Sequence, residues 1–366
     1  MVTRFATILL ICFCTAFIYS PASTFAQNPS QNSEVMIPLE GLDPVMLAEG
    51  KEVQGDMKYR ITRGRFQYIF ANEKNKQAFE KDPARYEIQL NGSCARMGAP
   101  TSGNPDLFAV YKERIYVFGS AECQTLFKAN PDKYLEVPAP PTEPPTEEML
   151  KRGQQLIAKA VESLGGPKLD QLASYQTKDQ RGNESKNTLL LVFPDKLRQE
   201  TVRPTFTFVS VLTPAESFVV VNNSARPMPA ANREAIHKSL YHEIIVLFRF
   251  RNRSDFKAWA TDKSRAGETE VEKVEIELGK FTTMLGIEPP TGRVLSQTYR
   301  GRGPGGMVGE IVINYSDFRS VDGMMLPFKT TATFDGEPFS GFSSTVEAIT
   351  INGKVDPASF EKPVKQ

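Results

Sequence analysis

Cysteine and histidine are the residue types in this chain best suited to metal, redox or acid–base chemistry. The chain has four cysteines and two histidines in 366 residues. Cys12 and Cys14 lie in an apolar N-terminal stretch, which leaves Cys94 and Cys123 as the candidate functional pair. Two cysteines in an oxidising compartment favour a disulfide, whereas in the cytosol a metal site is the first hypothesis.

The remaining chemistry-bearing residues do not predict an enzyme. His237 and His242 are five residues apart on an expected helix, so they point in different directions. His242 also lacks the second histidine of a zinc-protease helix. The glycine-rich segment 301–306 lies between two expected strands, which indicates a hairpin loop and not a phosphate-binding loop. We expect no catalytic residue and no cofactor, although a hydrolase-type site built from unrecognised carboxylates stays open.

The N-terminus has the three-part pattern of a secretory signal peptide. Arg4 precedes an apolar run at residues 5–19, and small residues around Ala26 provide a cleavage site. The run is about 15 residues long, and a membrane span needs about 20. An uncleaved anchor remains the alternative. We therefore expect a signal peptide at residues 1–26 and export to the periplasm, without stable membrane insertion after cleavage.

Composition points to two ordinary domains with no nucleic-acid partner. Charged residues make up 24% of the chain and the net charge is +1, so the surface as a whole does not attract an anionic polymer. Residues 138–146 are proline-rich and predict an extended linker. The expected domains are residues 36–137 and 147–366.

The first expected domain contains an internal repeat. Aromatic and proline residues recur 48 positions apart, which marks duplicated supersecondary units. In each unit the pattern predicts a β-hairpin followed by a short helix that is capped by Asn72 or Ser120. The repeated pairs are Tyr68 and Tyr116, Phe70 and Phe118, Phe79 and Phe127, Pro83 and Pro131, and Tyr86 and Tyr134.

These motifs resemble the YHS family, here as a degenerate tandem over about 95 residues. The resemblance rests on an Asp-Pro-Val start at residues 43–45, a Tyr-x-Phe strand end at residues 116–118 and an Asn-Pro-x-x-Tyr close at residues 130–134. In the family the cysteines can bind heavy metals. This chain departs from the pattern, because the first unit has no cysteine and Gly119 replaces the middle cysteine of the second.

Three states of Cys94 and Cys123 remain open, with the disulfide preferred. The pair could instead be unpaired buried thiols, or a metal or redox site. Tetrahedral zinc needs four ligands, and Cu(I) could use two thiolates with Met97 added.

The second expected domain begins with a helix at residues 147–164 and continues as a series of strands. Strand-like segments occur at residues 187–194, 205–212, 217–221, 269–278, 293–299, 309–315, 326–334 and 340–351. Turn residues separate most of them, which is typical of a large antiparallel sheet or barrel. The chain is therefore expected to be α+β: a small duplicated hairpin-and-helix domain, then an incomplete antiparallel β-barrel with covering helices.

A second helix, at residues 230–250, is expected to cover the open face of this sheet. Apolar residues recur along it at a four-residue step. If the helix is a lid, it would lie over an apolar pocket of several hundred Å³. The residues expected to line that pocket are Phe206, Phe208, Val219, Ile236, Leu240, Ile244, Phe248 and Phe334.

The layout of this domain resembles the outer-membrane lipoprotein-sorting family of periplasmic lipoprotein carriers. The matching features are the helix end at residues 164–166, the segments 194–198 and 315–327, and the C-terminal segment 351–360. The resemblance implies an incomplete barrel whose apolar interior holds acyl chains. An interior filled by its own side chains is the alternative.

The sequence thus predicts a periplasmic, non-enzymatic protein that carries or senses an apolar ligand or lipoprotein acyl chains. The alternatives are a metal- or thiol-responsive module that uses Cys94 and Cys123, and the hydrolase-type enzyme.

Overall fold

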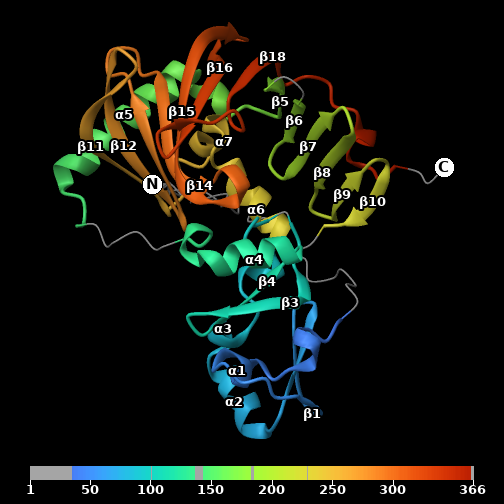
Figure 1. Cartoon of the computed structure of the whole chain (residues 1–366). Coiled ribbons are helices and arrows are strands. Elements are labelled where there is room, and N and C mark those ends of the chain that lie inside the picture. The colour runs from blue at the N-terminus through green and yellow to red at the C-terminus, as the bar shows by residue number, and fades with distance from the viewer. Residues whose placement is uncertain (1–34, 100, 137–142, 183–184, 229, 364–366) are drawn as a thin grey trace, which may run out of the picture.

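The structure is a computed structural model that describes residues 35–99, 101–136, 143–182, 185–228 and 230–363. The expected signal peptide and residues 138–142 of the expected linker lie outside these ranges. A small N-terminal part lies beside a larger part that is built on one curved sheet (Figure 1). None of the described helices combines the length and apolar character that a membrane span requires.

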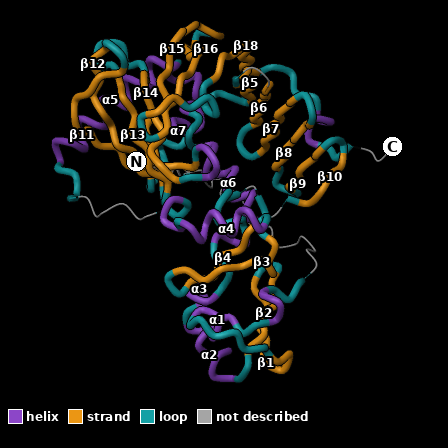
Figure 2. The backbone as a smooth tube through the Cα atoms, viewed as in Figure 1, coloured by secondary structure: helices purple, strands orange, loops and turns teal. Residues whose placement is uncertain are grey.

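Two hairpins, each followed by a helix, make up most of the N-terminal part (Figure 2). Asn72 caps the first helix and Ser120 caps the second, because each side chain accepts a hydrogen bond from the backbone N–H three residues later. The hairpin and helix expected in each unit are present, whereas superposition of the two units stays a prediction. The elements are α1 (Pro44–Ala48), β1 (Asp56–Arg63), β2 (Phe66–Phe70), α2 (Glu73–Lys81), α3 (Pro83–Tyr86), β3 (Asn104–Tyr111), β4 (Arg114–Phe118) and α4 (Ala121–Ala129).

Each unit packs around aromatic rings from its hairpin and its helix. The ring of Phe79 in α2 lies 5.0 Å from Tyr68 and 5.2 Å from Phe70, measured between centroids. The ring of Phe127 in α4 lies 5.0 Å from Phe118. Phe70 and Phe118 are both fully buried. The repeated aromatic residues are therefore the cores of the two units.

The larger part is a single antiparallel sheet that does not close into a barrel. β18 joins its two halves by pairing with β5 on one side and β16 on the other. Along the sheet the order is β10-β9-β8-β7-β6-β5-β18-β16-β15-β14-β13-β12-β11, and short β17 pairs only with β16. The bounds are β5 (Ser174–Arg181), β6 (Ser185–Val192), β7 (Lys196–Arg203), β8 (Phe206–Leu212), β9 (Ser217–Val221), β10 (Ser224–Pro227), β11 (Phe256–Ala266), β12 (Thr269–Leu278), β13 (Phe281–Ile287), β14 (Val294–Arg302), β15 (Val308–Val321), β16 (Met324–Phe334), β17 (Glu337–Pro338) and β18 (Ser344–Ile351).

The long helix α5 (Glu147–Leu164) covers β11 and β12. Thr146 caps its N-terminus, and Leu156, Ile157 and Leu164 are buried in the main apolar cluster. Gly153 lets the helix approach the sheet closely. A Cβ at this position would lie 2.5 Å from the Cα of Trp259 and 2.7 Å from the carbonyl oxygen of Ala258.

Replacing Gly153 with alanine should therefore destabilise the protein. In an open helix this change stabilises by about 1 kcal/mol. Here the contacting atoms belong to the backbone of β11, so we expect a net loss of about 1–3 kcal/mol in the free energy of unfolding. Denaturant unfolding measures the change, and Gln154→Ala at the exposed neighbouring position is the control. A gain in stability for Gly153→Ala would contradict this close packing.

The helix expected at residues 230–250 is two helices, α6 (Ala230–Leu240) and α7 (Ile244–Arg249). At the end of α6 the backbone N–H of His242 donates to the carbonyl oxygen of Ser239, and that of Glu243 donates to the carbonyl oxygen of Leu240. The backbone of Glu243 is extended, with φ −75° and ψ 113°. In α7, Ile245, Val246, Leu247 and Phe248 are all buried in the main apolar cluster. A helix that is apolar on every side is a core helix. The prediction of a single amphipathic lid helix was therefore wrong, and α7 is part of the core.

Candidate functional site

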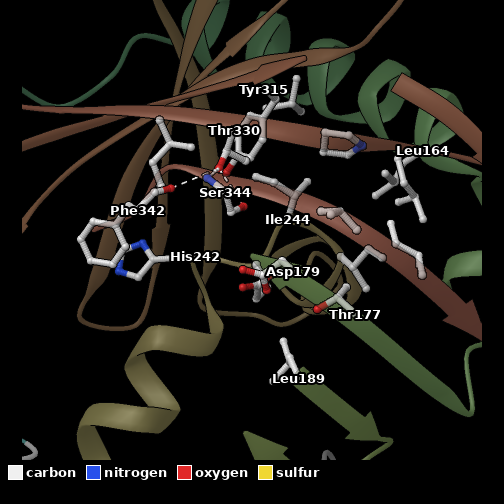
Figure 3. A pocket seen from close by; sticks show the side chains of 18 of the residues that line it. Leu164, Thr177, Asp179, Leu189, His242, Ile244, Tyr315, Thr330, Phe342 and Ser344 are labelled. Atoms are coloured by element: carbon white, nitrogen blue, oxygen red, sulfur yellow. Dashed lines mark hydrogen bonds between the residues drawn. The ribbon is translucent and has the colours of Figure 1, made fainter. Parts of the chain in front are cut away.

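The concave face of the sheet encloses a cavity of about 340 Å³ (Figure 3). Its walls come from β5, β6, β14, β15, β16 and β18, together with the C-terminal half of α5 and the connection from α6 into α7. This volume lies in the usual range for a small-ligand site. The expected interior space is therefore present in the described part of the chain.

Three of the eight residues predicted to line the pocket lie at a cavity. Ile244 and Phe248 line the main cavity, and Leu240 lines an adjoining space of about 30 Å³ beside β6 and β7. Ile236 and Val219 line neither, and pack against the main apolar cluster instead.

The other three predicted residues do not line either cavity. Phe334 is buried in a separate cluster with Tyr299 and Ile311, and Phe206 and Phe208 lie on β8. For Phe206 and Phe208 the reason is topological, because β6 and β7 separate β8 from β5, and the cavity is centred on β5 and β18. The sequence pattern does not reveal that strand order.

The cavity is polar at one end and apolar at the other. Successive inward positions of β5 are Tyr175, Thr177, Asp179 and Arg181, because side chains alternate along a strand. Figure 3 shows His242 and Leu164 on opposite sides of the cavity, with Asp179 between them. The strands next to β5 follow the same change from polar to apolar. Arg181 pairs with Ser344, and Asp179 pairs with Asn187. Thr177, by contrast, pairs with Leu189 on one side and Ile349 on the other.

Hydrogen bonds fix the side chains of the polar end. Arg181 Nε donates to Asp179 Oδ2 at 3.1 Å, and Asn187 Nδ2 donates to the same oxygen at 3.4 Å. Thr201 Oγ1 in turn donates to Asn187 Oδ1 at 2.9 Å. Asp179 is buried and Arg181 is its ion-pair partner, so this pair carries no net charge.

The break between α6 and α7 places two further titratable side chains in the cavity, those of His242 and Glu243. Burial lowers the pKa of His242 to about 4, so the ring is neutral at pH 7. That ring lies on Tyr299 with a centroid distance of 3.7 Å. Burial also raises the pKa of Glu243, the charge of Arg181 opposes this shift, and the charge of Asp179 adds a smaller increase.

The sequence does not identify Asp179, Arg181 or Glu243 as site residues. β5 itself was not expected, because its alternating polar residues are also typical of a solvated face. Glu243 was missed because apolar residues recur every four positions on both sides of it, so the sequence gives no sign of the turn between the two helices. A two-residue alternation of Tyr, Thr, Asp and Arg was the available signal for β5.

Cys94 and Cys123 are adjacent but do not form the predicted disulfide. Both are buried free thiols. Burial by itself would raise the pKa of Cys123, but hydrogen bonds from surrounding groups, Ser120 first, lower it below the usual value. Arg96 is one of these groups, with Nη1 at 3.7 Å from Cys123 Sγ. The disulfide prediction was therefore wrong, because both cysteines are free thiols and Cys123 lies beside the guanidinium of Arg96.

The thiol pair does not fit a metal site. A guanidinium beside Cys123 puts positive charge where a cation would bind. Among the described residues no group of three or more His, Cys, Asp or Glu side chains could hold a metal ion. The metal role inferred for Cys94 and Cys123 has no support in this geometry.

The N-terminal part contacts the larger part beside the polar end of the cavity. Arg302, which lines the cavity, donates from Nη1 to the carbonyl oxygens of Arg96 at 3.0 Å and Gly306 at 2.9 Å. Asn91 Nδ2 donates to Glu234 Oε2 of α6 at 2.9 Å. These bonds connect the thiol-bearing unit to the wall of the cavity.

Comparisons with known proteins find only distant structural likenesses. No family model matches the chain. No curated protein sequence matches it either. A DUF1329 family protein from Desulfovibrio piger has 13% identity and a TM-score of 0.37, with 58% of this chain and 98% of its own covered.

Two further solved structures are described as a lipoprotein-sorting protein domain and as a LolA superfamily protein. An outer membrane lipoprotein-sorting protein domain from Vibrio parahaemolyticus has 10% identity and a TM-score of 0.34, covering 58% of this chain and 97% of its own. A LolA superfamily protein from Nitrosomonas europaea has 10% identity and a TM-score of 0.35, covering 57% and 97%. Likenesses at this level do not assign the chain to a family, and none of them bears on the YHS resemblance.

Proposed function

We propose that this protein is a non-enzymatic binding protein that holds the apolar chain of an amphiphile in the cavity of its open sheet. The observation that carries the proposal is the cavity of about 340 Å³ with an apolar end. That end is formed by Leu164, Leu189 and Ile349, and burying a methylene group there contributes about 0.8 kcal/mol. A lipid or the acyl chain of a lipoprotein is the ligand class that fits such a space.

We place this function in the periplasm. The support is the signal-peptide pattern of the N-terminus, with Arg4, the apolar run and the small residues before Gln27. A carrier of apolar chains in an aqueous compartment needs an enclosed site, because exposed methylene groups are unfavourable in water.

Binding of a fluorescent alkyl chain with an uncharged head tests the proposal. We expect saturable binding of one probe per protein, with displacement by unlabelled alcohols. Each added methylene should strengthen displacement about fourfold until the chain fills the apolar end. Absence of saturable binding, or affinities that do not change with chain length, would show that the cavity is not a site for apolar chains.

A further inference from the structure

Glu243 is an acidic residue that lines the cavity. Its carboxyl group has no hydrogen bond and no ion pair to any of the described residues. Asp179, the other acid of the polar end, is paired with Arg181. A carboxylate that is removed from water without a partner is strongly disfavoured, and an incoming cation would relieve that cost.

The charge of Glu243 acts on three tyrosines, which lie on three strands. Tyr175 of β5, Tyr299 of β14 and Tyr315 of β15 all line the cavity. Burial raises the pKa of each hydroxyl, and the charge of Glu243 raises it further. The hydroxyl of Tyr315 donates to Gln297 Oε1 at 2.9 Å.

Aromatic rings beside an acid are the ingredients of an ammonium site. The faces of aromatic rings attract cations, and rings grouped around a cavity are used to bind quaternary ammonium heads. His242 adds a neutral ring, because it lies on Tyr299 and titrates near pH 4. The site therefore offers ring faces and one uncompensated acid at the same end of the cavity.

The arginines of the cavity do not cancel this acid. Arg181 is paired with Asp179, and Arg302 directs Nη1 to two backbone carbonyl oxygens at the contact with the N-terminal part. Arg293 lies over the ring of Phe318, with 5.4 Å between its guanidinium carbon and the ring centroid. At the polar end Glu243 is therefore the acid with which a cationic ligand can still form an ion pair.

We propose that the polar end of the cavity binds a cationic, ammonium-type head of an amphiphile, held by Glu243 beside Tyr299 and Tyr315. This inference rests on the proposed function and adds the chemistry of the head. The tail then extends past Thr177 toward Leu164 and Leu189. Arrival of the cation ionises Glu243, so binding releases a proton at a pH below the raised pKa of this acid.

Three twelve-carbon amphiphiles that differ only in their heads test the inference on the full chain. The probes are dodecyltrimethylammonium, dodecanol and dodecanoate, each used below the concentration at which it forms micelles. We expect the ammonium probe to bind about tenfold more tightly than the alcohol, and the carboxylate probe to bind most weakly. Affinity for the ammonium probe should fall as the pH is lowered through the pKa of Glu243, whereas affinity for the alcohol should not.

Glu243→Gln tests the contribution of the acidic group, because glutamine keeps the size of the side chain and cannot ionise. Because burial raises the pKa of Glu243, the folded protein favours the protonated acid over the carboxylate. The protonated acid's contribution to stability is present at low pH and is lost as the pH rises through the raised pKa. A neutral glutamine should therefore fold at least as well at neutral pH. We expect the variant to lose about tenfold in affinity for the ammonium probe and to bind dodecanol within about twofold of the unchanged protein. Glu347→Gln, at an exposed position of β18, is the matched control.

The outcomes separate the inference from the function on which it rests. If none of the three probes binds, the proposed carrier function fails. If dodecanol binds but the ammonium probe gains nothing over it, or if Glu243→Gln leaves the preference unchanged, only the ammonium site is overturned. Tighter binding of dodecanoate than of the ammonium probe would also overturn it.

Discussion

Replacing Thr177 with tryptophan should abolish binding of alkyl chains, with a loss of at least about tenfold in affinity. Thr177 lies at the middle of the inward face of β5, and its side chain points into the cavity (Figure 3). In the register of the sheet its neighbours are Leu189 and Ile349. An indole at this position would occupy the path between the polar and apolar ends.

The same substitution should leave the fold nearly unchanged. Tryptophan is compatible with a strand, and the ring enters empty space instead of a packed core. We expect the free energy of unfolding to change by less than about 1 kcal/mol. Thr345→Trp makes the same change at an exposed position of β18 and should bind probes normally. If Thr177→Trp binds as tightly as the control, the ligand does not lie in this cavity.

Phe79→Ala and Phe127→Ala should each destabilise the N-terminal part by about 3–5 kcal/mol. Both rings are almost completely buried at the centre of an aromatic cluster, with Phe127 at 1% exposure. Phe127 contacts four other aromatic rings, including those of Phe118 and Tyr116. Removal of either ring loses its apolar burial and leaves a void lined by the remaining rings.

The two losses should be similar, because Phe79 and Phe127 are matching positions of the 48-residue sequence repeat. Denaturant unfolding followed by far-ultraviolet circular dichroism and by tyrosine fluorescence reports the change. Glu80→Ala and Lys128→Ala are exposed controls that are again 48 positions apart, and we expect changes within about 0.5 kcal/mol. Losses that differ by more than about 2 kcal/mol would argue against equivalent cores.

The sequence predicts the apolar parts of this molecule and misses its polar interior. Phe70 and Phe118 are in the cores of the N-terminal units. The sequence predicts this because large aromatic side chains gain most from burial. Strands such as β8, β12 and β15 are recognisable because β-branched and aromatic residues favour pleated surfaces. The open antiparallel sheet follows from these strands and their turns.

The polar end of the cavity escaped prediction for two physical reasons. Asp179 and Arg181 are alternate residues of a strand and line the cavity. Alternating polar residues also occur on strands that face solvent, so the pattern alone cannot distinguish a cavity wall from a solvated face. The position of Glu243 depends on the break between α6 and α7, across which Ile236, Leu240, Ile244 and Phe248 keep a helical spacing. Strand order keeps Phe206 and Phe208 out of the cavity, because they lie on β8, away from β5 and β18.

Native mass spectrometry of the full chain incubated with dodecanol tests the central claim most directly. The claim is that the cavity on the concave face of the sheet holds one apolar chain. We predict a complex of one dodecanol with the unchanged protein and with Thr345→Trp, and no complex with Thr177→Trp. Absence of a complex with the unchanged protein, or an equally abundant complex with Thr177→Trp, would contradict it.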